Sequence, residues 1–136
     1  FQHSTLLLAQ EFLYTDFDWR IGVLDNQPLF ACRYYMVKNH WQIYRHGKST
    51  DSGGFDTLPT SEVPPGVLDA AMRATRPIGN GFYGVDVKER EGQGYVIEVN
   101  DNPNIDHGVE DKHLGMDLYR TIMATLLKRM EARRGH

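Results

Sequence analysis

The chain has 136 residues, with 15 lysines and arginines against 18 aspartates and glutamates, which gives a formal net charge of −3. A chain of this length fits one domain with its own core, so we expect residues 1–136 to form one folded unit. The slightly acidic charge argues against a nucleic-acid binder. No apolar run approaches the roughly 20 residues of a membrane span, which argues against a transmembrane protein. A single cysteine, Cys32, excludes an internal disulfide.

Apolar periodicity and turn residues predict two hairpins and two helices. The predicted elements are, in chain order, a buried strand over 6–13, a hairpin of strands 19–24 and 28–37, a loop over 46–62, a helix over about 66–78, a second hairpin of strands 82–88 and 94–100, an acidic loop over 101–113, and a helix over about 116–133. In the last helix, apolar residues recur at helical spacing from Leu118 to Met130, which predicts a buried face. The order predicts an α+β fold in which two main helices pack on an antiparallel sheet.

The second hairpin carries the side chains best suited to bind a metal ion. Because side chains alternate along a strand, Glu98 and Asn100 share one face, and the turn around residues 90–92 brings Asp86 opposite them. Carboxylate and amide oxygens on one face are typical ligands of Mg²⁺ or Mn²⁺. The alternative is an ordinary solvated face of the sheet.

Two arginines lie inside apolar, strand-like runs of the first hairpin. Pairing across the Asp25–Pro28 turn places Arg20 and Arg33 near each other, either as salt-bridged side chains or as an anion clamp beside the acidic group. The sequence contains no phosphate-binding loop of the G-x-x-x-x-G-K-[ST] type and no G-x-G-x-x-G fingerprint.

Several short segments together resemble the C-terminal part of the ATP-grasp ligases, and the RimK-type ligases in particular. These segments are Gln10-Glu11-Phe12-Leu13, Asp18-Trp19-Arg20-Ile21, Gly84-Val85-Asp86 and the run from Val96 to Pro103, within a likeness that extends from about Leu6 to Leu127. The resemblance implies an enzyme that uses ATP and Mg²⁺ (or Mn²⁺) to join an amine to a carboxylate through an acyl-phosphate.

The resemblance also implies roles for individual residues. Asp86, Glu98 and Asn100 match the magnesium ligands of the family. Glu11 and Phe12 match the hinge that meets adenine, and Asp18 matches the ribose contact. Arg20 and Arg33 match the catalytic arginines near the phosphates and the acyl-phosphate.

The partners implied are an amino-acid or other amine substrate and a carboxylate acceptor, either a small molecule or a protein C-terminus. We expect no nucleic-acid or membrane partner and a cytoplasmic location, with a homo-oligomer left open. The segment 39–46 does not match the stretch with which the family approaches the nucleotide. Since the family's first ATP-grasp subdomain has no counterpart here and Phe1 is not Met, we expect the chain to be the C-terminal portion of a larger ligase, inactive by itself.

Two other function classes fit parts of the pattern. A metal-dependent nuclease commonly has an Asp followed by Glu-x-Lys on a hairpin, but Asn100 occupies the place of that lysine. A non-catalytic metal- or nucleotide-binding module would keep the same ligands without turnover.

Overall fold

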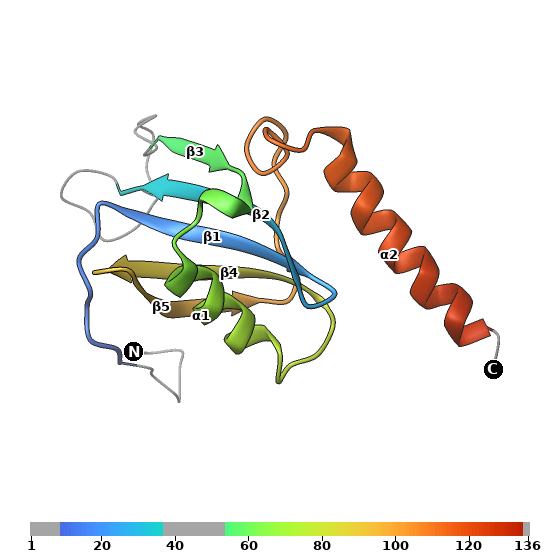
Figure 1. Cartoon of the computed structure of the whole chain (residues 1–136), viewed down its shortest axis with the longest axis horizontal. Helices are drawn as coiled ribbons and strands as arrows, with labels where there is room; N and C mark the ends of the chain where they lie inside the picture. The colour runs from blue at the N-terminus through green and yellow to red at the C-terminus, as the bar shows by residue number, and fades with distance from the viewer. Residues whose placement is uncertain (1–8, 37–53, 135–136) are drawn as a thin grey trace, which may run out of the picture.

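The structure is a computed structural model that describes residues 9–36 and 54–134. Its elements are β1 (Phe17–Leu24), β2 (Gln27–Tyr35), β3 (Phe55–Leu58), a 3₁₀ turn (Thr60–Glu62), α1 (Pro65–Thr75), β4 (Phe82–Arg90), β5 (Gln93–Asn100) and α2 (Met116–Arg134). The strands form one antiparallel sheet in the order β3-β2-β1-β4-β5, so the two hairpins meet where β1 pairs with β4 (Figure 1). This confirms the predicted α+β class.

The first hairpin turns on only two residues between its strands. Asp25 and Asn26 both have positive φ, 52° and 59°, which is the backbone of a tight primed turn whose twist matches that of the flanking strands. Asp and Asn adopt this conformation more readily than most side chains. The predicted turn is therefore confirmed.

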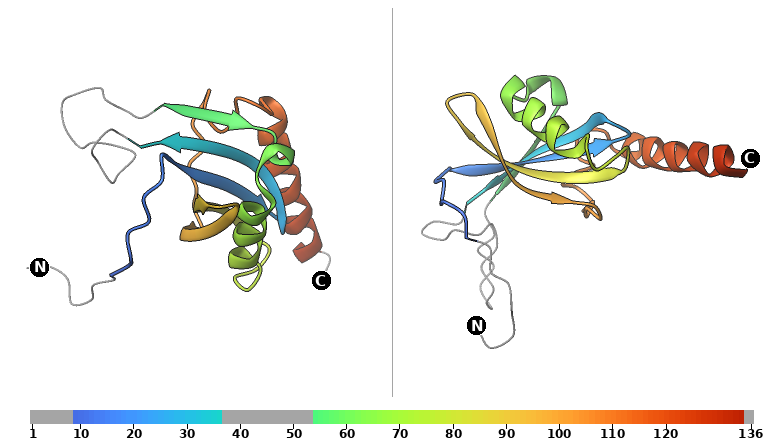
Figure 2. Two further views of the ribbon diagram at one scale, coloured as in Figure 1. Left: turned by 60° about the vertical axis from the view of Figure 1, so that its left-hand side comes forward. Right: turned by 90° about the horizontal axis from the view of Figure 1, so that it is seen from below.

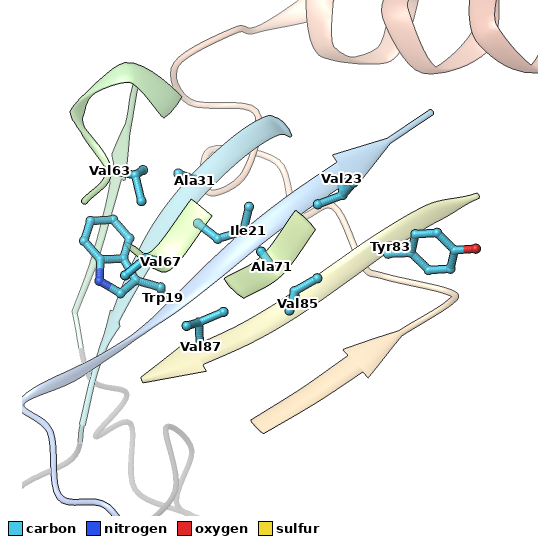
Figure 3. Packing of buried hydrophobic residues seen from close by; sticks show 10 residues of the cluster. All are labelled: Trp19, Ile21, Val23, Ala31, Val63, Val67, Ala71, Tyr83, Val85 and Val87. Atoms are coloured by element: carbon cyan, nitrogen blue, oxygen red, sulfur yellow. The ribbon is translucent and has the colours of Figure 1, made fainter. Parts of the chain in front are cut away.

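The main hydrophobic core lies between α1 and one face of the sheet (Figure 3). Val67 and Ala71 of α1 contact a layer of strand residues that includes Ile21 and Val85, all of them fully buried. Glycines allow the helix to approach the β4–β5 hairpin, because a Cβ on Gly94 would lie 2.7 Å from the Gly66 carbonyl oxygen. The close contact fixes α1 against the hairpin that carries the acidic residues.

A second core lies on the opposite face, and α2 contributes only its first turns to it. Leu118 and Ile122 pack against Phe30 and Tyr34 of β2, and the C-terminal part of the helix projects beyond the strands (Figure 2). Its apolar side chains there are exposed, although Arg129 still contacts Asp25 in the β1–β2 turn at 2.8 Å. The prediction of a buried face as far as Met130 was wrong, since Met130 is 52% exposed. Helical spacing shows which residues share a face but not whether a neighbour covers that face. In the part of the chain described here, neither helix is long and apolar enough to cross a membrane.

Two further predictions differ from the structure. Residues 9–13 of the predicted strand 6–13 are not in a strand, and residues 6–8 lie outside the described part. Both edges of β1 are already occupied by β2 and β4, so residues 9–13 cannot form a hairpin with the strand that follows them. The predicted loop 46–62 contains β3, which pairs with β2, while residues 46–53 lie outside the described part.

Candidate functional site

The second hairpin brings the three predicted metal ligands to one face of the sheet, as expected. Asp86 pairs with Glu98 across the ladder, and Gly84 pairs with Asn100, so both β5 residues lie on the face that carries Asp86. This face is opposite α1, and we call it the site face. Glu98 is exposed, while Asp86 and Asn100 are partly buried.

A β-bulge sets this arrangement. The register shifts after the Asp86–Glu98 pair so that Val87 faces Val96, which leaves Ile97 as an extra residue in β5. Val96 and Val99 therefore both pack toward the α1 core, although strict alternation would place them on opposite faces. The bulge aims Glu98 at the site face while Val96 and Val99 complete the core.

Arg20 binds the Asp86 carboxylate with both ends of its guanidinium. Nε lies 2.8 Å from Oδ1 and an Nη lies 2.9 Å from Oδ2, a bidentate pair across the β1–β4 ladder. The pairing raises the pKa of Arg20 well above its ordinary value, mainly through the hydrogen bond to Asp86. The guanidinium carbon also lies 5.5 Å from the centre of the Tyr34 ring, so Arg20 is held on two sides.

Arg33 does not lie beside Arg20, so the predicted proximity of the two arginines was wrong, and each is salt-bridged to an aspartate, as the alternative to a clamp predicted. In the ladder Arg20 faces Cys32 and Trp19 faces Arg33, so the two arginine side chains leave opposite faces of the sheet. Arg33 lies over the Phe17 and Trp19 rings, at 5.3 and 5.6 Å, and contacts Asp56 at 3.4 Å. The structure thus assigns Arg33 to an aromatic contact on the α1 side, away from Asp86.

The predicted hinge residues line an open pocket at one end of the site face. The pocket has a volume of about 740 Å³ and is lined by Glu11, Phe12, Leu13, Tyr14, Arg90 and Tyr95. Tyr95 pairs with Lys88, which lies two residues beyond Asp86 on the same strand, so the pocket and the acidic group share the site face. Phe12 and Tyr14 are strongly exposed, which leaves aromatic surface available to a planar ligand.

Asp18, predicted to contact ribose, is engaged in a buried ion pair. Lys88 Nζ lies 2.5 Å from Asp18 Oδ1 and 2.8 Å from the Thr15 hydroxyl, which itself donates to Asp18 Oδ1. Lys88 is only 6% exposed. The structure therefore places Asp18 beside the pocket, where it supports the pocket wall through Lys88.

The loop after Asn100 is fixed to the sheet by a fully buried carboxylate. Glu110 accepts a hydrogen bond from the Tyr34 hydroxyl and a second, at 2.8 Å, from the Asp106 backbone N–H. Burial, followed by the bond to Glu110, raises the pKa of Tyr34, so this hydroxyl stays protonated and donates. Arg20, Tyr34 and Glu110 thus connect the acidic group on β4 to the loop that follows it.

The neighbouring carboxylate, Asp111, fixes the same loop to α2. It accepts hydrogen bonds from His107 Nδ1, the Gly108 N–H and the Tyr119 hydroxyl, at 2.9, 2.6 and 3.0 Å. These contacts lower the pKa of Asp111, with the His107 contact the largest cause.

The donor chemistry of Asp86, Glu98 and Asn100 fits a divalent cation. Each Asp86 oxygen accepts one arginine N–H and keeps further lone-pair capacity. The Asn100 side-chain oxygen accepts the Asn102 N–H at 2.8 Å, which orients the amide. Among the described residues no group of three or more His, Cys, Asp or Glu side chains is placed to hold a metal, so the candidate set consists of two carboxylates and one amide.

The sequence alone did not single out Lys88 or Glu110 as residues of the site. Lys88 follows Asp86 at i+2, so strand alternation already placed it on the site face, and its charge was a usable signal. Glu110 carried no such signal, because an acidic loop gives no indication of which carboxylate will be buried.

No protein-family model and no curated protein matches the chain. Among solved structures it is similar to D-alanine–D-alanine ligase from Bacillus anthracis complexed with ATP, with 16% identity and a TM-score of 0.63 over 89% of this chain and 43% of the ligase. A second structure of the same ligase gives a TM-score of 0.61 at 16% identity, over 89% of this chain and 42% of that one. The ATP-grasp ligase PsnB, complexed with a phosphomimetic variant of its minimal precursor, Mg and ADP, matches at 24% identity and a TM-score of 0.48, over 72% of this chain and 27% of PsnB.

At these identities the likeness establishes a shared fold. The five-stranded antiparallel sheet with two helices matches part of the D-alanine–D-alanine ligase, which is an ATP-grasp fold. The chain spans less than half of the length of either ligase.

Proposed function

We propose that the chain is the metal-binding, C-terminal part of an ATP-dependent carboxylate–amine ligase of the RimK type. One observation carries the proposal: Asp86, Glu98 and Asn100 lie together on one sheet face, with Arg20 bound to Asp86. The ATP-grasp fold supports it. The reaction would activate a carboxylate with ATP and then couple it to an amine, such as an amino acid.

The two chemical steps make separate demands on the site. A carboxylate oxygen attacks the γ-phosphorus of ATP, which forms an acyl-phosphate and releases ADP. An amine then attacks the acyl carbon, which forms the amide and releases inorganic phosphate and a proton. Negative charge accumulates on phosphate oxygens in the first step, so positioning and positive charge supply most of the catalysis.

The residues of the site face meet these demands. Asp86, Glu98 and Asn100 would hold Mg²⁺, which supplies positive charge at the phosphate oxygens when bound. Arg20 fixes the orientation of Asp86 through two hydrogen bonds, which keeps one ligand in place before the cation arrives. The pocket beside Phe12 would receive the adenine base, at the end of the face toward Lys88.

Metal binding is the first test, and it needs only this chain. Titration with Mn²⁺, followed by the loss of its free electron paramagnetic resonance signal, should show a site that Glu98→Gln weakens at least about tenfold. Glu62→Gln, an exposed glutamate on the 3₁₀ turn, is the matched control and should bind as the wild type does. If Glu98→Gln and the control bind equally, the proposed site is wrong.

Turnover is the second test, made on the protein that carries this chain. With ATP, Mg²⁺ and a carboxylate, added hydroxylamine should trap the acyl-phosphate as a hydroxamate, with one ADP released for each hydroxamate. Glu98→Gln should abolish both products. ADP binding with no turnover across a panel of carboxylates and amines would instead favour the non-catalytic module.

A further inference from the structure

We propose that Lys88 is a positioning residue that fixes one wall of the nucleotide pocket. The inference rests on the proposed function, because it takes the pocket beside Phe12 as the place of the adenine base. It goes beyond the metal ligands and Arg20, since Lys88 lies next to neither ATP phosphates nor the reacting carboxylate in that arrangement.

The two walls of the pocket come from different parts of the chain. One wall is the segment from Glu11 to Tyr14, which belongs to no strand, and the other is formed by Arg90 and Tyr95 at the tip of the β4–β5 hairpin. A segment outside the sheet has no ladder hydrogen bonds to hold it, so its position depends on individual contacts.

Lys88 provides such contacts between β4 and the segment that precedes β1. It belongs to β4, the same strand as Arg90, and its Nζ donates to Thr15 and to Asp18, just after the Glu11–Tyr14 wall. The same Nζ lies 6.0 Å from the centre of the Phe12 ring. One buried ammonium therefore links both walls.

The geometry assigns Lys88 an indirect role. The side chain is 7% exposed and two of its donors are already used within the protein, so a ligand in the pocket would meet Phe12 and Tyr14 and not the ammonium itself. A further contact, from the Met36 N–H to the Asp16 carbonyl oxygen at 3.0 Å, holds the end of the segment and does not reach its pocket-lining part. Loss of Lys88 should release the wall while leaving Glu98 and Asn100 in place.

The test compares two probes that report on different ends of the site face. Adenosine has no phosphate, so its affinity, measured by NMR chemical-shift titration, reports on the pocket alone. The affinity for Mn²⁺ reports on the acidic group. Lys88→Met removes the charge at nearly constant length, Lys88→Arg restores a donor, and Lys128→Met on the exposed side of α2 is the control. The ¹⁵N heteronuclear NOE of residues 11–16, which falls as a backbone becomes mobile, follows the wall without any ligand.

The expected result is a separation of the two probes. Lys88→Met should weaken adenosine binding at least about tenfold, because the wall loses the charged hydrogen bonds that hold it, and should lower the heteronuclear NOE of residues 11–16. Mn²⁺ affinity should stay within twofold of the wild type, and Lys88→Arg should recover most of the adenosine affinity. An unchanged heteronuclear NOE at residues 11–16 in Lys88→Met overturns the inference, and so does an equal loss of both probes.

Two further outcomes keep the inference separate from the proposed function. If the wild type binds no adenosine, the assignment of the pocket to the nucleotide fails, while a lower heteronuclear NOE in Lys88→Met would still show that Lys88 holds the wall. If Lys88→Met does not fold, Thr15→Val keeps the ion pair of Lys88 with Asp18 and removes one contact to the wall. A heteronuclear NOE in Thr15→Val as high as in the wild type would then overturn the inference.

Discussion

Replacing Arg20 by Met removes the guanidinium bound to Asp86 while keeping a long apolar side chain in the strand. The wild-type pair has two hydrogen bonds of 2.8 and 2.9 Å, and its side chains are 25% and 21% exposed. Hydrogen bonds to charged groups stabilise by about 1.5–3 kcal/mol, and partial exposure places this pair toward the lower end. The variant also leaves the Asp86 carboxylate opposite Glu98, so we expect a loss of about 2 kcal/mol in the free energy of unfolding.

Urea unfolding followed by circular dichroism measures this loss, and thermal unfolding should show a midpoint lower by about 7 °C for a chain of this size. Arg73→Met is the matched control, because its pair with Asp69 spans 3.4 Å between side chains that are 77% and 65% exposed. Such surface pairs contribute little, so the control should unfold as the wild type does.

Divalent cations should act in the opposite direction. Without Arg20, Asp86 and Glu98 are neighbouring carboxylates that contact no basic side chain within residues 9–36 and 54–134, so Mn²⁺ should stabilise the variant more than the wild type and reduce the difference between them. Equal stability of Arg20→Met and Arg73→Met would refute the importance assigned to the pair. Equal stabilisation of wild type and variant by Mn²⁺ would refute the proposal that the cation uses Asp86.

Three other substitutions or conditions test the surroundings of the site. Tyr34→Phe removes the hydrogen bond to the buried Glu110 and should lower the free energy of unfolding by about 1–3 kcal/mol in urea. Asp111→Asn should be less stable than the wild type at neutral pH, and the difference should shrink as the pH falls below about 4. The sign follows because contacts such as that of His107 lower the pKa of Asp111 in the folded state, and its contribution is lost only when the carboxylate is protonated. Burial raises the pKa of the Cys32 thiol to about 11, so a disulfide reagent at pH 8 should label it only after the protein is unfolded in urea.

Each of these three results has a clear contrary outcome. A Tyr34→Phe protein as stable as the wild type would mean that Glu110 finds another donor. A difference for Asp111→Asn that persists unchanged down to pH 2 would remove the carboxylate charge as its cause. Rapid labelling of native Cys32 would contradict its burial.

The sequence predicted the hairpins and the shared face of Asp86, Glu98 and Asn100 because both follow from local rules. Alternation in a strand and a short polar turn fix which side chains lie opposite each other once the hairpin forms. The extra residue at Ile97 did not disturb the outcome, because the bulge falls between the core-facing Val96 and Glu98.

The predictions that were wrong concern contacts between residues far apart in the sequence. The register of the first hairpin places Arg33 opposite Trp19, and a pairing shifted by one residue would have moved it to the site face beside Arg20. The segment before β1 is apolar enough for a strand, but β1, its neighbour in sequence, is paired on both sides, with β2 and β4. The choice of Glu110 as the buried carboxylate depended on Tyr34, 76 residues earlier.

The pairing of β1 with β4 also determines the stage of folding at which the site can form. Each hairpin can form from neighbouring residues, but the Arg20–Asp86 and Lys88–Asp18 contacts connect positions 66 and 70 residues apart. Closing such long loops costs chain entropy before any contact repays it, so we expect docking of the two hairpins to be the slow step of folding. A partly folded chain would therefore have strands and turns but neither the metal ligands in place nor the pocket wall held, and site assembly would report the docking of the two halves of the sheet.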